Sequence, residues 1–123
     1  MKKLLLFAML LATVAMTSCS KSSSSTPTLV GKWKVVNSIS ISSGYTNTYT
    51  GVSADYVEFK TNGTVTSFVD GELTTTSYSV SGTNAVIDGV DYSITTLTTS
   101  AATLYHTEGS GSSRYQVTIN LRK

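Results

Sequence analysis

The chain has 123 residues, 40% of them hydrophobic and 13% charged, with a formal net charge of +2. This length fits one folded domain. Lys2 and Lys3 account for the net charge, because the remaining Lys and Arg residues equal Asp and Glu in number. Neither sign clusters along the sequence, whereas a nucleic-acid-binding domain has a basic stripe. Cys19 is the only cysteine, so an intrachain disulfide is excluded and stability must come from a packed core.

The N-terminal segment has the pattern of a secretion signal. Two lysines follow Met1, and an apolar run extends from Leu4 to Ala15. This run is too short to span a bilayer as a helix, which needs about 20 residues. Small residues then precede the cysteine in Met16-Thr17-Ser18-Cys19. We therefore assign residues 1–18 to a signal helix that is not part of the fold.

The segment ending at Cys19 resembles the lipobox of bacterial lipoprotein signal peptides. The resemblance implies that Cys19 becomes the lipidated N-terminus, carrying three acyl chains of the palmitate type, and that the protein resides in the cell envelope. Ser20 follows, and no aspartate there resembles an inner-membrane retention signal, which favours the outer membrane. No acidic run resembles a surface-export signal, so the periplasmic leaflet is expected rather than the cell surface. Residues 19–28 are rich in serine and predict a flexible tether.

From Leu29 onward, apolar residues recur with a period of two, which is typical of half-buried β-strands. Trp33, Val35, Ile39 and Ile41 are expected on one face of the first strand. No window after Cys19 shows helical spacing. Strands are expected at residues 31–41, 44–51, 55–60, 63–69, 72–80, 84–88, 90–97, 101–107 and 113–122.

Glycine-containing dipeptides separate several of these strands. Asn62-Gly63, Asp70-Gly71 and Asp88-Gly89 tolerate positive φ and favour two-residue hairpins. Eight or nine short strands joined by tight turns predict an all-β fold, an antiparallel meander that closes into a barrel or splits into a sandwich.

The first strand opens with Gly31-Lys32-Trp33, and this Gly-x-Trp resembles the opening of lipocalins and lipocalin-like bacterial domains. The strand-turn-strand pattern at residues 57–64 is similar to that family too. The resemblance covers residues 29–123 and implies an up-and-down barrel of about eight strands. It also implies that Trp33 closes one end beside Gly31, with a basic residue of the last strand packed over the ring. Arg122 is the first candidate for that cation and Arg114 the second.

Tyrosines are the best candidates for contacts to a ligand. Tyr92 shares a face with Ile94, and Tyr115 shares one with Val117, so both are expected to point inward. With Tyr78 they offer apolar rings and polar hydroxyls to an amphipathic or hydrophobic ligand. A barrel of about eight strands is just wide enough to be filled by its side chains or to hold one small ligand.

Two functions follow from these alternatives. The first is a monomeric, lipid-anchored envelope lipoprotein whose lipocalin-like domain binds a small hydrophobic ligand. The second is a structural or accessory lipoprotein with a filled barrel that binds a protein partner. A membrane-spanning barrel is less favoured, because its strands need about 9–11 residues and most of these are shorter.

The residues indicate neither catalysis nor a bound metal or cofactor. His106 is the only histidine, and general acid–base catalysis needs several converging groups, so we interpret it as a surface or barrel-rim residue. The pairs Asp70/Glu72 and Asp88/Asp91 flank glycine turns, where Asp is expected for backbone reasons. No Cys/His cluster offers a zinc site. We therefore expect no enzyme activity.

Overall fold

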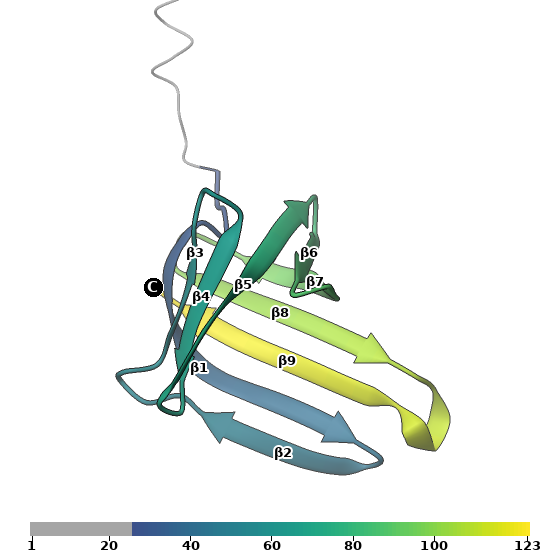
Figure 1. Cartoon of the computed structure of the whole chain (residues 1–123). Helices are drawn as coiled ribbons and strands as arrows, with labels where there is room; N and C mark the ends of the chain where they lie inside the picture. The colour runs from purple at the N-terminus through teal and green to yellow at the C-terminus, as the bar shows by residue number, and fades with distance from the viewer. Residues whose placement is uncertain (1–25) are drawn as a thin grey trace, which may run out of the picture.

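The computed structural model describes residues 26–123 (Figure 1), so the predicted signal segment, Cys19 and most of the predicted tether lie outside it. The described chain is all-β, with one short 3-10 turn, η1 (Gly111–Ser113). Within residues 26–123 no helix is long and apolar enough to cross a membrane. The strands are β1 (Gly31–Ser42), β2 (Tyr45–Thr50), β3 (Tyr56–Phe59), β4 (Thr64–Val69), β5 (Glu72–Ser81), β6 (Asn84–Ile87), β7 (Val90–Leu97), β8 (Ala101–Glu108) and β9 (Tyr115–Arg122).

The strands confirm the predicted antiparallel barrel. Each strand from β3 to β9 pairs with its neighbour in sequence, and β9 pairs with β1 to close a barrel of eight strands. β2 is the ninth strand and stays outside the closure. It pairs only with the outer half of β1, from Asn37 to Ser42, while β3 pairs with the inner half of the same edge, from Gly31 to Lys34.

Gly51 lies in the connection between β2 and β3, where the pairing partner along this edge of β1 changes from one strand to the other. Its N–H donates a hydrogen bond to the carbonyl of Val36 at 2.9 Å. A Cβ at this position would lie 1.8 Å from the carbonyl oxygen of Val35, so only glycine lets the two backbones approach this closely.

The prediction that four apolar residues of the first strand share one face is wrong. Trp33 and Val35 are buried inside the barrel, but the β1–β9 register shifts between Val35 and Asn37. This β-bulge adds one residue to β1 and turns every later side chain to the opposite face. Ile39 and Ile41 therefore lie on the outer face, and Ser38 and Ser40 lie on the inner one.

Two of the three predicted hairpin turns have the expected form. Val69 pairs with Glu72 and Ile87 with Val90, which leaves two-residue loops at Asp70-Gly71 and Asp88-Gly89. Asn62-Gly63 instead belongs to a longer loop, because the N–H of Lys60 bonds to the carbonyl of Thr64. The Asn62 side chain stabilises this loop by accepting hydrogen bonds from the backbone and hydroxyl of Thr64.

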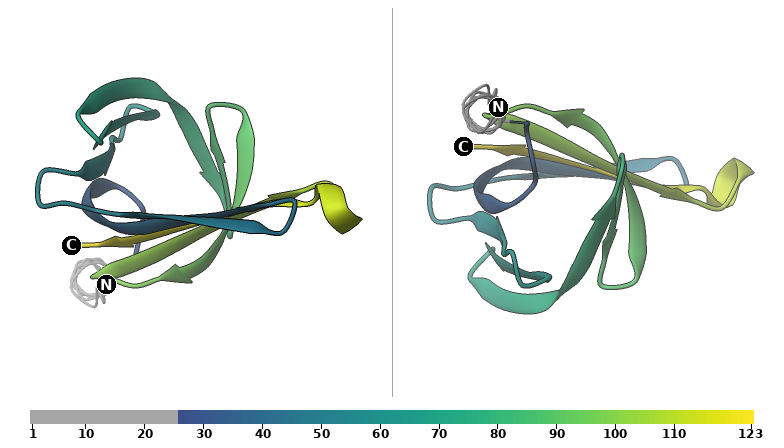
Figure 2. Two further views of the ribbon diagram at one scale, coloured as in Figure 1. Left: turned by 90° about the horizontal axis from the view of Figure 1, so that it is seen from below. Right: turned by 90° about the horizontal axis from the view of Figure 1, so that it is seen from above.

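Long strands extend beyond the barrel on one side. Figure 2 shows β1, β2, β8 and β9 continuing outward as one flat sheet with η1 at its tip. β2 forms the free edge of this projecting sheet. Its first residue, Tyr45, is 82% exposed.

The opposite end of the barrel is closed around Trp33, which is fully buried. The indole N–H donates to the carbonyl of Leu29 at 2.7 Å, so the chain entering the domain is fixed to the floor of the barrel. The Nζ of Lys123 lies 4.6 Å from the centre of the ring. The prediction that Arg122 or Arg114 packs over this ring is wrong: the cation is Lys123, directly after the last strand, and Arg122 is exposed on the outer face. Arg114 lies before β9, at the far end of that strand.

Gly31 supports this closure. Its φ is +126°, a conformation that L side chains rarely adopt, and a Cβ here would lie 3.1 Å from Nζ of Lys123. Glycine thus lets the lysine side chain cross the start of β1 and reach the indole.

Candidate ligand-binding cavity

The barrel encloses an open-ended cavity of about 280 Å³. Val35 and Leu121 line it toward the Trp33 end, and Ser38 and Ile119 line it toward the projecting sheet, at the end that we call its mouth. All nine strands contribute to its wall. The lining residues are Val35, Ser38, Tyr49, Val57, Phe59, Val65, Ser67, Val69, Thr76, Ile87, Tyr92, Leu104, Ile119 and Leu121.

The wall of the cavity is apolar with a few hydroxyl groups. No charged side chain lines it. The hydroxyl of Thr76 donates to the Asp88 carboxylate at 2.9 Å. Within residues 26–123, no side-chain hydrogen bond involves the hydroxyls of Ser38, Ser67 or Tyr92. No buried side-chain polar atom in that part of the chain lacks a partner, so these three hydroxyls are open to the cavity or solvent. They are free to bind a ligand.

Tyr49 is held in the wall by a buried carboxylate. Its hydroxyl donates to Oδ2 of Asp55 at 2.5 Å, and Asp55 is only 1% exposed. The backbone N–H groups of Val52 and Asp70 also donate to Asp55, at 2.9 and 3.2 Å. The Tyr49 hydrogen bond lowers the pKa of Asp55 and raises that of Tyr49. At neutral pH the pair therefore holds an ionised carboxylate behind a neutral phenol.

Tyr92 is also a neutral phenol at the cavity. Burial raises its pKa, and the nearby Tyr115 raises it further. Since both tyrosines of the wall stay protonated, the cavity presents apolar surface and neutral hydroxyls. Such a wall suits an uncharged apolar molecule.

Beyond the mouth, the inner face of the barrel continues along the projecting sheet. Ser38 and Ile119 pair across β1 and β9 in the cavity wall. One step outward on the same face, Ser40 pairs with Val117, and Val117 pairs with His106 of β8. His106 therefore lies at the rim of the cavity, where its ring centre is 5.5 Å from that of Tyr92.

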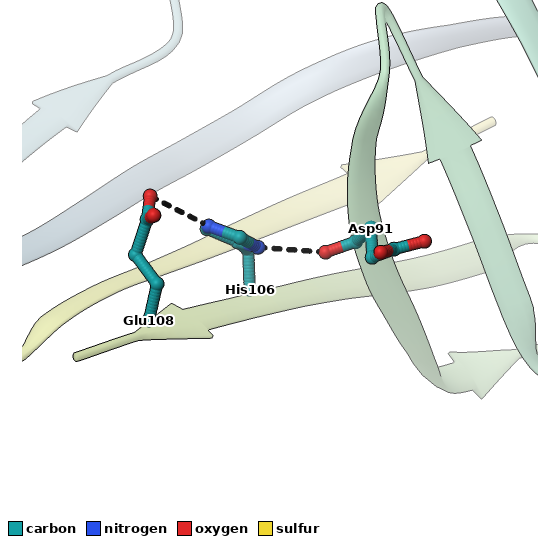
Figure 3. Close-up of polar contacts among 3 residues, drawn as sticks. All are labelled: Asp91, His106 and Glu108. Atoms are coloured by element: carbon teal, nitrogen blue, oxygen red, sulfur yellow. Dashed lines mark hydrogen bonds and ion pairs between the residues drawn. The ribbon is translucent and has the colours of Figure 1, made fainter. Parts of the chain in front are cut away.

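His106 is held between two hydrogen-bond acceptors (Figure 3). Its Nδ1 is 2.7 Å from the backbone carbonyl of Asp91, and its Nε2 is 3.1 Å from the Glu108 carboxylate. A carbonyl and a carboxylate can only accept, so the ring donates both hydrogen bonds at once only in its imidazolium form. The Glu108 bond is the main cause that raises the pKa of His106 above 6.5, and the Asp91 bond adds to it.

The three tyrosines predicted to contact a ligand lie in different places. Tyr92 lines the cavity. Tyr78 belongs to the closed end, where its ring meets Phe59 edge-on at 5.0 Å and its hydroxyl donates to the Lys60 carbonyl at 2.6 Å. Tyr115 shares the inner face with Val117 as expected, but it lies beyond the cavity on the projecting sheet and is 38% exposed.

Tyr49 was not predicted as a lining residue. β2 reads Tyr-Thr-Asn-Thr-Tyr-Thr and has no aliphatic residue that would mark a buried face. A period of two puts Tyr45 and Tyr49 on the same face of β2, but only Tyr49 lies at the cavity.

Comparison with family models, with curated proteins and with solved structures finds no match to this chain. The function is therefore argued from the cavity itself. In the part of the chain that the structure describes, no three His, Cys, Asp or Glu side chains gather where they could hold a metal ion.

Proposed function

We propose that this protein is a lipid-anchored lipoprotein of the bacterial envelope whose lipocalin-like barrel binds one small hydrophobic molecule. The observation that supports this most directly is the cavity, which is open at one end, apolar, and left unfilled by the side chains of all nine strands. Its volume of about 280 Å³ is just below the range for small-molecule sites, about 300–1,000 Å³. The ligand is therefore a short-chain or single-ring compound rather than a large cofactor.

The hydroxyl groups refine the ligand class. Ser38, Ser67 and Tyr92 can each donate or accept one hydrogen bond to a ligand with a single polar group. No charged group lies in the wall to neutralise a buried ionic ligand, and an unpaired buried charge is very costly. We expect a neutral molecule with an apolar body and one hydroxyl, carbonyl or ether oxygen.

Native mass spectrometry tests this proposal. Residues 26–123 contain every strand and the whole core, so this piece is purified from cells without detergent and also titrated with n-decanol. Ser67→Phe fills the cavity from its wall. Ser77→Phe places the same ring on the outer face of the adjacent strand as a matched control. We expect Ser67→Phe to abolish decanol binding and Ser77→Phe to retain it. Failure of the unaltered protein to bind decanol or any co-purified apolar molecule would reject the proposal.

The proposed anchor has a separate test. Cys19→Ala in the full chain removes the thiol that would carry the lipid, and the protein should leave the membrane fraction. Metabolic labelling with an alkyne-tagged palmitate should mark the unaltered chain and not the variant. An unlabelled chain would reject the anchor without affecting the ligand proposal.

A protein partner remains the second candidate function, and the free edge of β2 favours it. This six-residue strand has no lysine, proline or bulge of the kind that usually protects an edge from pairing. A partner strand would bind there by its backbone, outside the cavity. Thr48→Pro should abolish such binding while leaving decanol binding intact.

A further inference from the structure

Charged residues that are dispersed in the sequence are separated by the fold into two ends. Of the six Lys and Arg side chains in residues 26–123, five lie where β1 begins, β3 ends and β9 ends. These are Lys32, Lys34, Lys60, Arg122 and Lys123, and all five are exposed. Two acids lie among them: Glu58, opposite Lys32 on β3, and the buried Asp55, which lines a depression with Lys34 and Lys123. We call these five residues the basic face.

The exposed acidic residues occupy the other end of the barrel. Asp70 and Glu72 lie at the β4–β5 turn, Asp88 and Asp91 lie at the β6–β7 turn, and Glu108 ends β8. In an up-and-down barrel these turns all lie at the mouth, away from the closed end. Arg114 is the one arginine at that end, next to η1. The barrel is therefore positive at its closed end and negative around its mouth.

The basic face is unfavourable for the isolated domain. Lys34 lies directly opposite Arg122 in the β1–β9 pairing, and like charges at directly opposed positions are destabilising. Within residues 26–123, no Lys or Arg nitrogen lies within 4.0 Å of a carboxylate, since the one charged pair found there is His106 with Glu108. An anionic partner would relieve this repulsion.

Exposed apolar side chains lie beside these cations. Val36 and Val52 are 39% and 60% exposed, and they line one surface depression together with Lys34 and Arg122. Val30, at the start of the domain, is 40% exposed, and its carbonyl lies 3.4 Å from Nζ of Lys123. Cations interspersed with apolar side chains match the interfacial region of a bilayer, where charged headgroups meet acyl chains.

The chain also enters the domain at this end. Residues 27–30 cross the closed end against the β3–β4 and β5–β6 turns. If Cys19 carries lipid, as proposed above, the segment from Cys19 to Thr26 reaches at most about 25 Å when fully extended. The basic face is then the part of the barrel held nearest the membrane.

From this arrangement we propose that the basic face is a membrane-docking surface that binds the headgroups of anionic phospholipids. Docking directs the mouth of the cavity away from the bilayer, because the acidic end is repelled by the same headgroups. The proposal does not need the lipid anchor or an apolar ligand, since charge and apolar exposure alone define the surface.

Vesicle flotation tests the proposal on residues 26–123, which lack the proposed lipid. The domain should float with vesicles of phosphatidylcholine mixed with phosphatidylglycerol at low salt, and not with phosphatidylcholine alone. High salt should release it. Each cation near an anionic surface strengthens binding about fivefold, so Lys34→Gln with Arg122→Gln should weaken it about 25-fold. Arg114→Gln removes a positive charge at the mouth and should leave binding unchanged.

Several results would overturn the proposal. No flotation with anionic vesicles at low salt excludes the surface. Equal flotation with both kinds of vesicle shows that charge does not direct binding. An equal loss in Arg114→Gln shows that net charge, not this face, is recognised. Fluorescence of the buried Trp33 confirms that each variant is folded, so a loss of flotation reports binding.

Discussion

The Nζ of Lys123 lies 4.6 Å from the centre of the Trp33 ring, and together these two side chains close one end of the barrel. Lys123 is directly after the last strand, and Trp33 is near the start of the first. Their contact therefore joins the two ends of the folded domain at the seam where β1 and β9 complete the closure.

Removing the Trp33 side chain should destabilise the barrel much more than removing the Lys123 side chain. Trp33→Ala removes a fully buried indole and should lower the free energy of unfolding by about 3–5 kcal/mol. Lys123→Gln loses only an exposed cation–π contact, worth about 0.5–1 kcal/mol. Arg122→Gln is the matched control, and chemical denaturation should find it within about 0.5 kcal/mol of the unaltered protein. An effect of Arg122→Gln equal to that of Lys123→Gln would contradict the contact.

The hydrogen bond between Tyr49 and Asp55 should be visible in the titration of the carboxyl. Tyr49→Phe removes the donor that contributes most to lowering the pKa of Asp55, so that pKa should move back toward its ordinary value. The unfolding temperature should fall because a buried acceptor loses a partner. Tyr45→Phe, at the exposed start of the same strand, should change neither quantity. Carboxyl NMR shifts measure the pKa, and an unchanged value in Tyr49→Phe would show that the bond is absent in solution.

His106 should make the stability of the domain depend on pH. Its pKa is raised in the folded state, so its contribution is fully present below its unfolded pKa of about 6.5 and is lost as the pH rises through the folded value. His106→Gln should therefore be destabilised relative to the unaltered protein at acidic pH, with the difference shrinking toward alkaline pH. Thermal unfolding across that range measures it. A difference that grows with rising pH would show that the imidazole is neutral in the fold.

Gly51 should be intolerant of even the smallest side chain. In Gly51→Ala the new methyl group would lie 1.8 Å from a backbone oxygen of β1, which forces the strands apart. Overpacking of this kind costs about 1–3 kcal/mol or more. Ser53→Ala, in the same connection but exposed, should stay within about 0.5 kcal/mol. Equal stability of the two variants would mean that Gly51 does not pack as closely against the backbone of β1 as described.

The strands could be predicted from the sequence to within two residues at each end, because glycine dipeptides mark most of the turns. The β-bulge at Val36 could not be predicted from the sequence. It lies where the edge of β1 changes partner from β3 to β2, and this tertiary pairing leaves no local signal in the sequence. That single residue moved Ile39 and Ile41 to the outer face. The cation on Trp33 was expected from β9, but the residue that reaches the ring is Lys123, which follows that strand.

The residues of the candidate cavity show the same limit. Tyr92 was predicted from its alternation with Ile94, and it lines the cavity. Tyr115 alternates with Val117 in the same way, but it lies so far along β9 that it is beyond the mouth. A period of two tells which face a side chain lies on and not its position along the barrel axis. The sequence also did not reveal the separation of basic and acidic residues between the two ends. Successive turns alternate between these ends, so residues of each sign are dispersed along the chain.

The acids around the mouth also bear on the proposed ligand binding, because they would affect how fast a ligand enters the cavity. An anion approaching Asp70, Glu72, Asp88, Asp91 and Glu108 meets a repulsive field that extends about one Debye length, or about 8 Å at physiological salt. A neutral molecule meets no such barrier. Association of an anionic ligand should therefore accelerate as salt is added, while association of a neutral one should not change. If the cavity binds ligands as proposed, the rim would select among them by association rate before the cavity wall selects among them by affinity.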